Sequence, residues 1–140
     1  MAGESVLTGK CLCGGVRYEI GGPVTGGVYC HCSQCRRASG SAFAANAGVA
    51  KEDFRLVAGE DLLRGFESSP KKFRWFCSRC GSPIYSVIPA DPNTVRIRLG
   101  TLDGDPGIRP GLHVFVGSKA SWHEITDELP RFDERPARRS

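Results

Sequence analysis

The sequence predicts an all-β domain in which short strands are held together by metal-binding cysteines. Three observations lead to this expectation. The chain has 140 residues, which fits one domain. It contains seven cysteines, all within three short clusters. Short runs with strand character, bounded by turn residues, follow one another along the chain. No segment shows a sustained helical period and no internal repeat is visible, so we expect few short helical turns.

The expected strands follow the chain in order. Residues 16–20 alternate apolar and polar side chains until a Gly-Gly-Pro break ends the run, which predicts a hairpin-like approach to the second cysteine cluster. Seven further runs have strand character: residues 42–49, 54–57, 62–66, 72–76, 84–88, 94–99 and 112–116. The one predicted helical turn covers residues 33–39. Trp75 and Trp122 are expected in the core.

Composition and charge disfavour several classes of protein. With 40% hydrophobic and 24% charged residues, the chain is globular and neither disordered nor fibrous. The net charge of +4 owes much to Arg135, Arg138 and Arg139, so the body of the chain is nearly neutral. A nucleic-acid or anionic-membrane binder would carry a larger basic surface, whereas a small acidic metabolite remains compatible. We expect the Arg-rich residues 131–140 to form a flexible tail.

The sequence also indicates a cytoplasmic protein. No run approaches the roughly 18 consecutive apolar residues that a membrane helix needs. Residues 1–10 lack the basic-then-apolar pattern of a secretory signal. Because cytosolic thiols are kept reduced, an odd number of cysteines is better explained by metal coordination than by disulfides.

Three cysteine clusters carry the predicted chemistry. They are Cys11-Leu-Cys13, Cys30-His-Cys32-Ser-Gln-Cys35 and Cys77-Ser-Arg-Cys80. Glycine follows the first and the last cluster, and it supplies the positive φ with which a chain leaves a bound ion. Structural Zn²⁺ sites take four soft sulfur ligands in a tetrahedron, and these two clusters together offer four.

The middle cluster then remains as a tripod with an open fourth position, the arrangement of a catalytic zinc. The spacing does not force this division. Two of the middle cysteines could instead join the first pair, and a binuclear thiolate cluster is also compatible. His31 could complete the tripod, although its ring would have to fold back over the ion that its neighbours bind. Inert buried thiols are a poorer explanation, because isolated buried cysteines rarely cluster in this way.

The segments around the cysteines are distinctive in themselves. They read GKCLCGGVRY over residues 9–18, CHCSQCRRASGS over 30–41 and FCSRCGSP over 76–83. RLGTLD, HVF and KASW follow at residues 98–103, 113–115 and 119–122. With these segments in this order, nearly the whole chain, from residue 7 to 132, resembles the glutathione-dependent formaldehyde-activating enzyme family, which also includes centromere protein V.

The resemblance implies a small zinc-stapled, β-tent-like domain over residues 5–130, with two zinc ions per chain. The structural zinc would be shared by the first CxC and the late CxxC, and a more labile zinc would be held by Cys30, Cys32 and Cys35. The family activity is that of a carbon-sulfur lyase in its formal direction, and it joins formaldehyde and glutathione to S-(hydroxymethyl)glutathione. Three cysteinates make a weak Lewis acid, so we expect a zinc-bound glutathione thiolate, with zinc stripping by glutathione as the alternative.

Polar residues beside the tripod are candidates for substrate binding. Arg36 and its neighbour Arg37 could meet a glutathione carboxylate, since guanidinium groups match carboxylates. Ser39 and Ser41 could donate to substrate or end the helical turn. His113 could shuttle protons, although its apolar run is more typical of a packed residue. The competing function is a non-catalytic zinc module that binds a protein or nucleic-acid partner through the Arg-rich tail.

Overall fold

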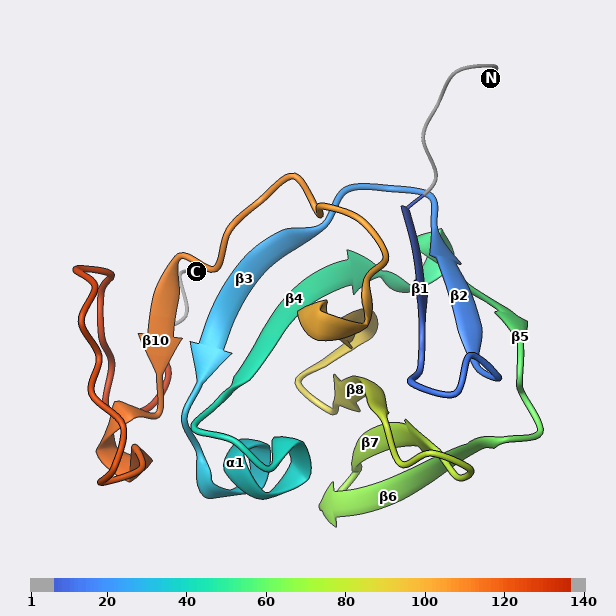
Figure 1. Cartoon of the computed structure of the whole chain (residues 1–140). Coiled ribbons are helices and arrows are strands. Elements are labelled where there is room, and N and C mark those ends of the chain that lie inside the picture. The colour runs from blue at the N-terminus through green and yellow to red at the C-terminus, as the bar shows by residue number, and fades with distance from the viewer. Residues whose placement is uncertain (1–6, 137–140) are drawn as a thin grey trace.

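In a computed structural model of the chain, two β-sheets share one core, and the expected all-β class is confirmed (Figure 1). The structure describes residues 7–136. The strands are β1 (Leu7–Lys10), β2 (Arg17–Ile20), β3 (Thr25–Cys30), β4 (Ala44–Ala50), β5 (Phe54–Ala58), β6 (Leu63–Ser69), β7 (Lys72–Cys77), β8 (Pro83–Ile88), β9 (Asp91–Arg98) and β10 (Leu112–Val114). The helical elements are α1 (Ser33–Ser39) and three 3-10 turns, Lys51–Asp53, Leu99–Thr101 and Val116–Ser118.

The strands form one small and one large sheet. The small sheet has the order β1-β2-β5 and is antiparallel throughout. The large sheet has the order β10-β3-β4-β9-β8-β7-β6, and its one parallel pair is β10 with β3. Figure 1 shows α1 just beyond the ends of β3 and β4. Within the described part of the chain, none of the helices is long or apolar enough to cross a bilayer.

The main core lies between the two sheets. Ala47 and Val49 of β4 and Val95 and Ile97 of β9 are buried there against Tyr18 of β2. Successive side chains of a strand point to opposite faces of a sheet. The residues between these apolar positions therefore lie on the other face of the large sheet, outside this core.

All eight expected strands are present, with boundaries shifted by a few residues, and the helix over residues 33–39 is confirmed. The expected number of strands was wrong, because β1 and β3 add two more. Both are short and contain glycine, which is depleted in strands. Glycine is needed because a Cβ at Gly9 would lie 2.3 Å from the ring of Tyr18, and one at Gly27 would lie 3.0 Å from Pro110. Tertiary contacts thus outweigh local propensity.

The C-terminal part of the described chain differs from the sequence expectation in two places. Trp122 was expected in the core, but its side chain is 72% exposed. The tail was expected to begin at residue 131, yet the backbone there is hydrogen-bonded to β10 and the turn after it. Phe132 N donates to His113 O at 3.0 Å, and Phe115 N donates to Glu134 O at 3.0 Å. Residues 137–140 of the expected tail lie outside the described residues.

Gly59 gives a test of how tightly β5 approaches the first cysteine turn. Its φ is +86°, and a Cβ added there would lie 2.3 Å from Gly15 O. We expect Gly59→Ala to lower the free energy of unfolding by about 2–4 kcal/mol, because left-handed strain and overpacking add. Gly21→Ala is the matched control, since a Cβ there meets nothing within 4 Å. Urea titrations of both variants check this, and equal stabilities would contradict the close approach.

Candidate metal centres

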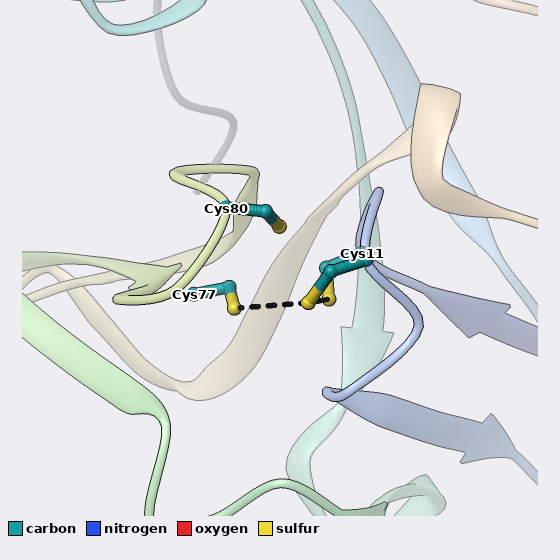
Figure 2. Close-up of side chains that lie close together, drawn as sticks. Cys11, Cys77 and Cys80 are labelled. Carbon is teal, nitrogen blue, oxygen red and sulfur yellow. Dashed lines mark hydrogen bonds between the residues drawn. The ribbon is translucent and has the colours of Figure 1, made fainter.

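The first candidate centre joins two turns that are far apart in the sequence. Cys11 and Cys13 lie in the turn between β1 and β2. Cys77 ends β7, and Cys80 lies in the turn that follows. The four sulfur atoms lie within 4.8 Å of one another. Figure 2 shows Cys11, Cys77 and Cys80 with their sulfurs directed into the space between the two turns. We call these residues the four-cysteine cluster.

The spacing and chemistry of this cluster fit a tetrahedral metal ion. Cys11 Sγ lies 3.5 Å from Cys13 Sγ, which lies 3.8 Å from Cys77 Sγ. Sulfurs around a tetrahedral zinc with ordinary bond lengths are about 3.8 Å apart. Gly14 and Gly81, which follow the two cysteine pairs, have φ values of 79° and 80°, as the sequence predicts. The four-cysteine cluster could therefore hold zinc.

Nearby donors favour the deprotonated thiols that metal binding requires. The backbone N–H of Gly15, followed by Arg79, lowers the pKa of Cys13, and Arg79 Nε donates to Cys13 Sγ at 3.3 Å. The Ser82 hydroxyl lowers the pKa of Cys80 to about 5. The cluster thus contains groups that stabilise its negative charge before any ion binds.

The second candidate centre is the cysteine trio, Cys30, Cys32 and Cys35, which lies where β3 meets α1. Cys30 ends β3, and Cys32 is the N-cap of α1 with its Sγ accepting from Cys35 N at 3.3 Å. The three sulfurs lie within 4.8 Å of one another. At the other end of α1, Gly40 is left-handed and donates its N–H to Arg36 O, closing the helix. The start of the helix therefore brings the trio together.

Charge in the trio is shared unequally. The pKa of Cys32 is far below its ordinary value because its sulfur accepts hydrogen bonds from Cys30 and then Cys35. The pKa of Cys30 is far above its ordinary value because it donates to Cys32 and is buried. Arg74 supports the anionic form, since both terminal guanidinium nitrogens lie 3.8 Å from Cys35 Sγ. Among the described residues no fourth ligand atom joins these three sulfurs, so a metal ion held by them would keep a position for an exogenous ligand.

The trio opens onto a cavity of about 340 Å³. Among the described residues, the charged side chains that line it are all cationic: Lys72, Arg74, Arg96, Arg98 and Arg135. Arg74 and Arg98 are each only 8% exposed. Burial lowers the pKa of Arg98 to about 10, which still leaves it charged at neutral pH. An anion in this cavity would therefore meet several cations at short range and in a low dielectric.

Strand register places these cations. Arg74 of β7 pairs with Ser86 of β8, which pairs with Arg96 of β9, so the three form a row across the sheet. Arg98 follows Arg96 by two residues and faces the same way. The sequence interpretation missed this set. The available signal was the stretch Val95-Arg-Ile-Arg98, in which apolar and basic residues alternate.

The predicted substrate contacts lie outside this cavity. Arg36 Nε donates to Ser118 O at 3.1 Å, and Arg36 is absent from the lining. Ser39 Oγ donates to Cys35 O at 2.7 Å and contacts Ser41 Oγ at 3.1 Å, so it serves the end of α1. The structure brings together the seven cysteines as two groups, but it does not bring Arg36 or Ser39 into the lining of the trio's cavity.

His31 points away from the trio. Its Nε2 lies 2.9 Å from His113 Nδ1, and the ligand atoms that group at this site belong to the three cysteines. Burial lowers the pKa of His31 to about 4, so the ring is neutral near pH 7. His113, expected as a packed residue or proton shuttle, is 2% exposed and also contacts Asp127 at 3.1 Å. The geometry therefore gives no support to His31 as a fourth ligand.

Known proteins resemble the chain over most of its length. The family model described as "Glutathione-dependent formaldehyde-activating enzyme" matches residues 6–118. A Halomonas elongata protein named "Putative glutathione-dependent formaldehyde-activating enzyme" is 31% identical over 129 residues, covering 86% of this chain and 81% of that protein. A protein of the same name from Aspergillus oryzae is 30% identical over 83 residues, covering 58% of this chain and 44% of the fungal protein.

A solved structure is similar in fold. The crystal structure of a Rhodobacter sphaeroides protein matches with a TM-score of 0.60 at 26% sequence identity. The match covers 74% of this chain and 91% of that one. This chain is thus similar to known proteins in both sequence and fold.

Replacing one cysteine in each group tests the division into four and three. We expect metal analysis of the wild type to give two zinc ions per chain. Cys77→Ser should abolish folding, since a structural zinc site contributes about 10–16 kcal/mol. Cys35→Ser should keep the far-UV circular dichroism of the wild type and lose one zinc. Equal loss of structure in both variants would reject the division.

Proposed function

The chain belongs to the glutathione-dependent formaldehyde-activating enzyme family, and from this premise we propose that it condenses glutathione with formaldehyde at the cysteine trio. The product would be S-(hydroxymethyl)glutathione, which makes the enzyme a carbon-sulfur lyase in its formal direction. The names of the relatives support this reaction. The single observation that carries the proposal is the cysteine trio facing a cavity with cationic walls.

The charges of the cavity match those of a glutathione thiolate. Three cysteinates exceed the 2+ charge of one zinc ion and leave a single negative charge. Lys72, Arg74 and Arg98 place three positive charges around it. The positive charge that remains suits a thiol that brings further negative charge, as glutathione does with its two carboxylates. Buried cations are costly without counter-charges, so an anionic ligand would be bound favourably here.

A second lobe extends the cavity along β3, β4 and β9. Its volume is about 490 Å³, and it shares Arg96 and Arg135 with the first. Asp91 is the one carboxylate among the described residues that line either lobe. We propose that the carboxylates of glutathione lie on the arginines and that its ammonium group lies towards Asp91. Its sulfur would then reach the trio.

Zinc bound by Cys30, Cys32 and Cys35 would supply an open coordination position that holds an incoming thiol in its deprotonated form. In the condensation, a sulfur lone pair forms the carbon-sulfur bond and the carbonyl π electrons move to oxygen. That oxygen takes up a proton equivalent to the one the thiol lost, so the reaction balances. Lys72 lines the cavity, and burial lowers its pKa. We propose that its ammonium group donates this proton.

The four-cysteine cluster would hold the second zinc with a structural role, because no exogenous ligand is needed to complete four sulfurs. Cysteinates and glutathione are maintained in the reduced form in the cytoplasm. We therefore propose a cytoplasmic site of action.

Arg98→Met tests carboxylate recognition. We expect kcat/KM for glutathione to fall about 10-fold to 100-fold, the effect of one lost hydrogen bond to a charged group. With 2-mercaptoethanol, which has no carboxylate, it should change less than about twofold. Exchange spectroscopy of the thiol and formaldehyde mixture measures both rates above the uncatalysed blank. Arg64→Met is the control, because Arg64 is exposed and its guanidinium meets only backbone carbonyls.

The same assay tests the reaction itself. Cys35→Ser should reduce adduct formation to the rate of the blank with either thiol. If the wild type gives no acceleration over the blank, the chain has another substrate or acts as a binding module. If Arg98→Met lowered kcat/KM equally for both thiols, Arg98 would act through the fold and not by binding a carboxylate.

A further inference from the structure

A chain of hydrogen bonds connects the protein surface to the back of the cysteine trio. His31 Nε2 lies 2.9 Å from His113 Nδ1, and His113 Nε2 lies 3.1 Å from both carboxylate oxygens of Asp127. The two rings are buried, with exposures of 0% and 2%. Asp127 is exposed. Neither ring lines the cavity of the trio, so the proposed reaction gives these residues no task.

When both rings are neutral, the carboxylate of Asp127 sets the direction of every hydrogen bond in this series. An ionised carboxylate only accepts hydrogen bonds, so His113 Nε2 must carry the hydrogen. The Nδ1 of a neutral His113 is then an acceptor, and His31 Nε2 must be the donor. His31 Nδ1, which has no partner among the described residues, is left as a bare acceptor. The opposite direction would bury an N–H donor without an acceptor there, which is the rarer arrangement in proteins.

This chain restrains the segment that carries two of the three sulfurs. Cys30 ends β3 and Cys32 is extended, with φ −65° and ψ 157°. In an extended segment, alternate side chains point to opposite sides. Cys30 and Cys32 thus face the cavity, while the ring of His31 faces His113 of β10. The backbone N–H of His31 also donates to Val114 O of β10 at 3.0 Å. Fixing the ring on one side limits rotation of the sulfurs on the other.

Asp127 is itself held in place. Its Oδ1 accepts from Leu129 N at 2.9 Å, and its carbonyl accepts from Arg131 at 3.2 Å. His113 N donates to Pro130 O at 2.9 Å, which ties the same loop to β10. These contacts hold the loop of Asp127 in place in addition to the contact between its carboxylate and the ring of His113.

We propose that Asp127 is a positioning residue that, acting through His113 and His31, holds Cys30 and Cys32 in the orientation that a bound metal requires. The proposal rests on the proposed function only in that the trio holds a metal ion. Groups that orient the residues of a metal site commonly change its affinity about 10-fold to 100-fold.

Zinc release from the fully loaded protein tests this role. A chromogenic chelator should remove the zinc of the trio before that of the four-cysteine cluster. We expect Asp127→Ala to speed the first phase about tenfold and to leave the second unchanged. Glu128→Ala is the matched control, because it removes an adjacent exposed carboxylate that makes no hydrogen bond or ion pair with His113 in the described part of the chain. Asp127→Asn should restore slow release, since its amide oxygen can accept from the same N–H.

Nitrogen-15 spectra supply a readout that a merely structural role would not move. At pH 8, above the ordinary pKa of histidine, both His31 and His113 should show the Nε2–H tautomer in the wild type. In Asp127→Ala this preference should be lost at His113 and then at His31, whereas Glu128→Ala should retain it.

The outcomes separate this proposal from the function on which it rests. Release of only one zinc from the wild type would contradict the metal-binding trio itself. Two zincs with no faster first phase in Asp127→Ala would overturn the positioning role alone. Equal acceleration of both phases would show a general loss of stability, and an Nδ1–H tautomer in the wild type would show that the chain runs in the other direction. Either result would also overturn the proposal.

Discussion

Contact between two distant turns is the constraint on which the rest of the molecule depends. Cys13 and Cys77 are 64 positions apart, yet their sulfurs lie 3.8 Å from each other. Closing a loop of this length costs about 4 kcal/mol, well below the roughly 10–16 kcal/mol that a structural zinc site provides. The contact fixes the β1–β2 turn of the small sheet against the β7–β8 turn of the large one. This placement puts the shared core between the two sheets and leaves the opposite face of the large sheet for the cavity of the trio.

The sequence could predict the parts of the structure that depend on local chemistry. The spacing showed three cysteine clusters, the family resemblance implied their division into four and three, and the structure brings the seven sulfurs together in this way. The helix at residues 33–39 is confirmed because its start is fixed locally, by the sulfur of Cys32 accepting from the backbone of Cys35. The cap and the cysteine trio involve groups only a few residues apart, whereas the joining of the first and last cysteine pairs across 64 positions was implied by the family resemblance.

What the sequence did not reveal depends on partners that only the fold brings together. β1 and β3 have little strand character of their own, and their glycines leave room for the ring of Tyr18 and the backbone of Pro110. The cationic wall combines β7 with β9, so no single segment contains it. Arg36 was an attractive candidate because it follows the trio in the chain. Sequence proximity on a helix nevertheless does not say which way a side chain points, and Arg36 turns to Ser118.

The alternation in β9 has a consequence for how this protein can change. Val95 and Ile97 belong to the core, while Arg96 and Arg98 line the cavity, so one strand serves both stability and recognition. Inserting or deleting a single residue there would exchange the two faces. Guanidinium groups would enter the apolar interior at the same moment as isoleucine and valine entered the site. During evolution, β9 can therefore accept substitutions position by position, but single-residue insertions and deletions are closed to it.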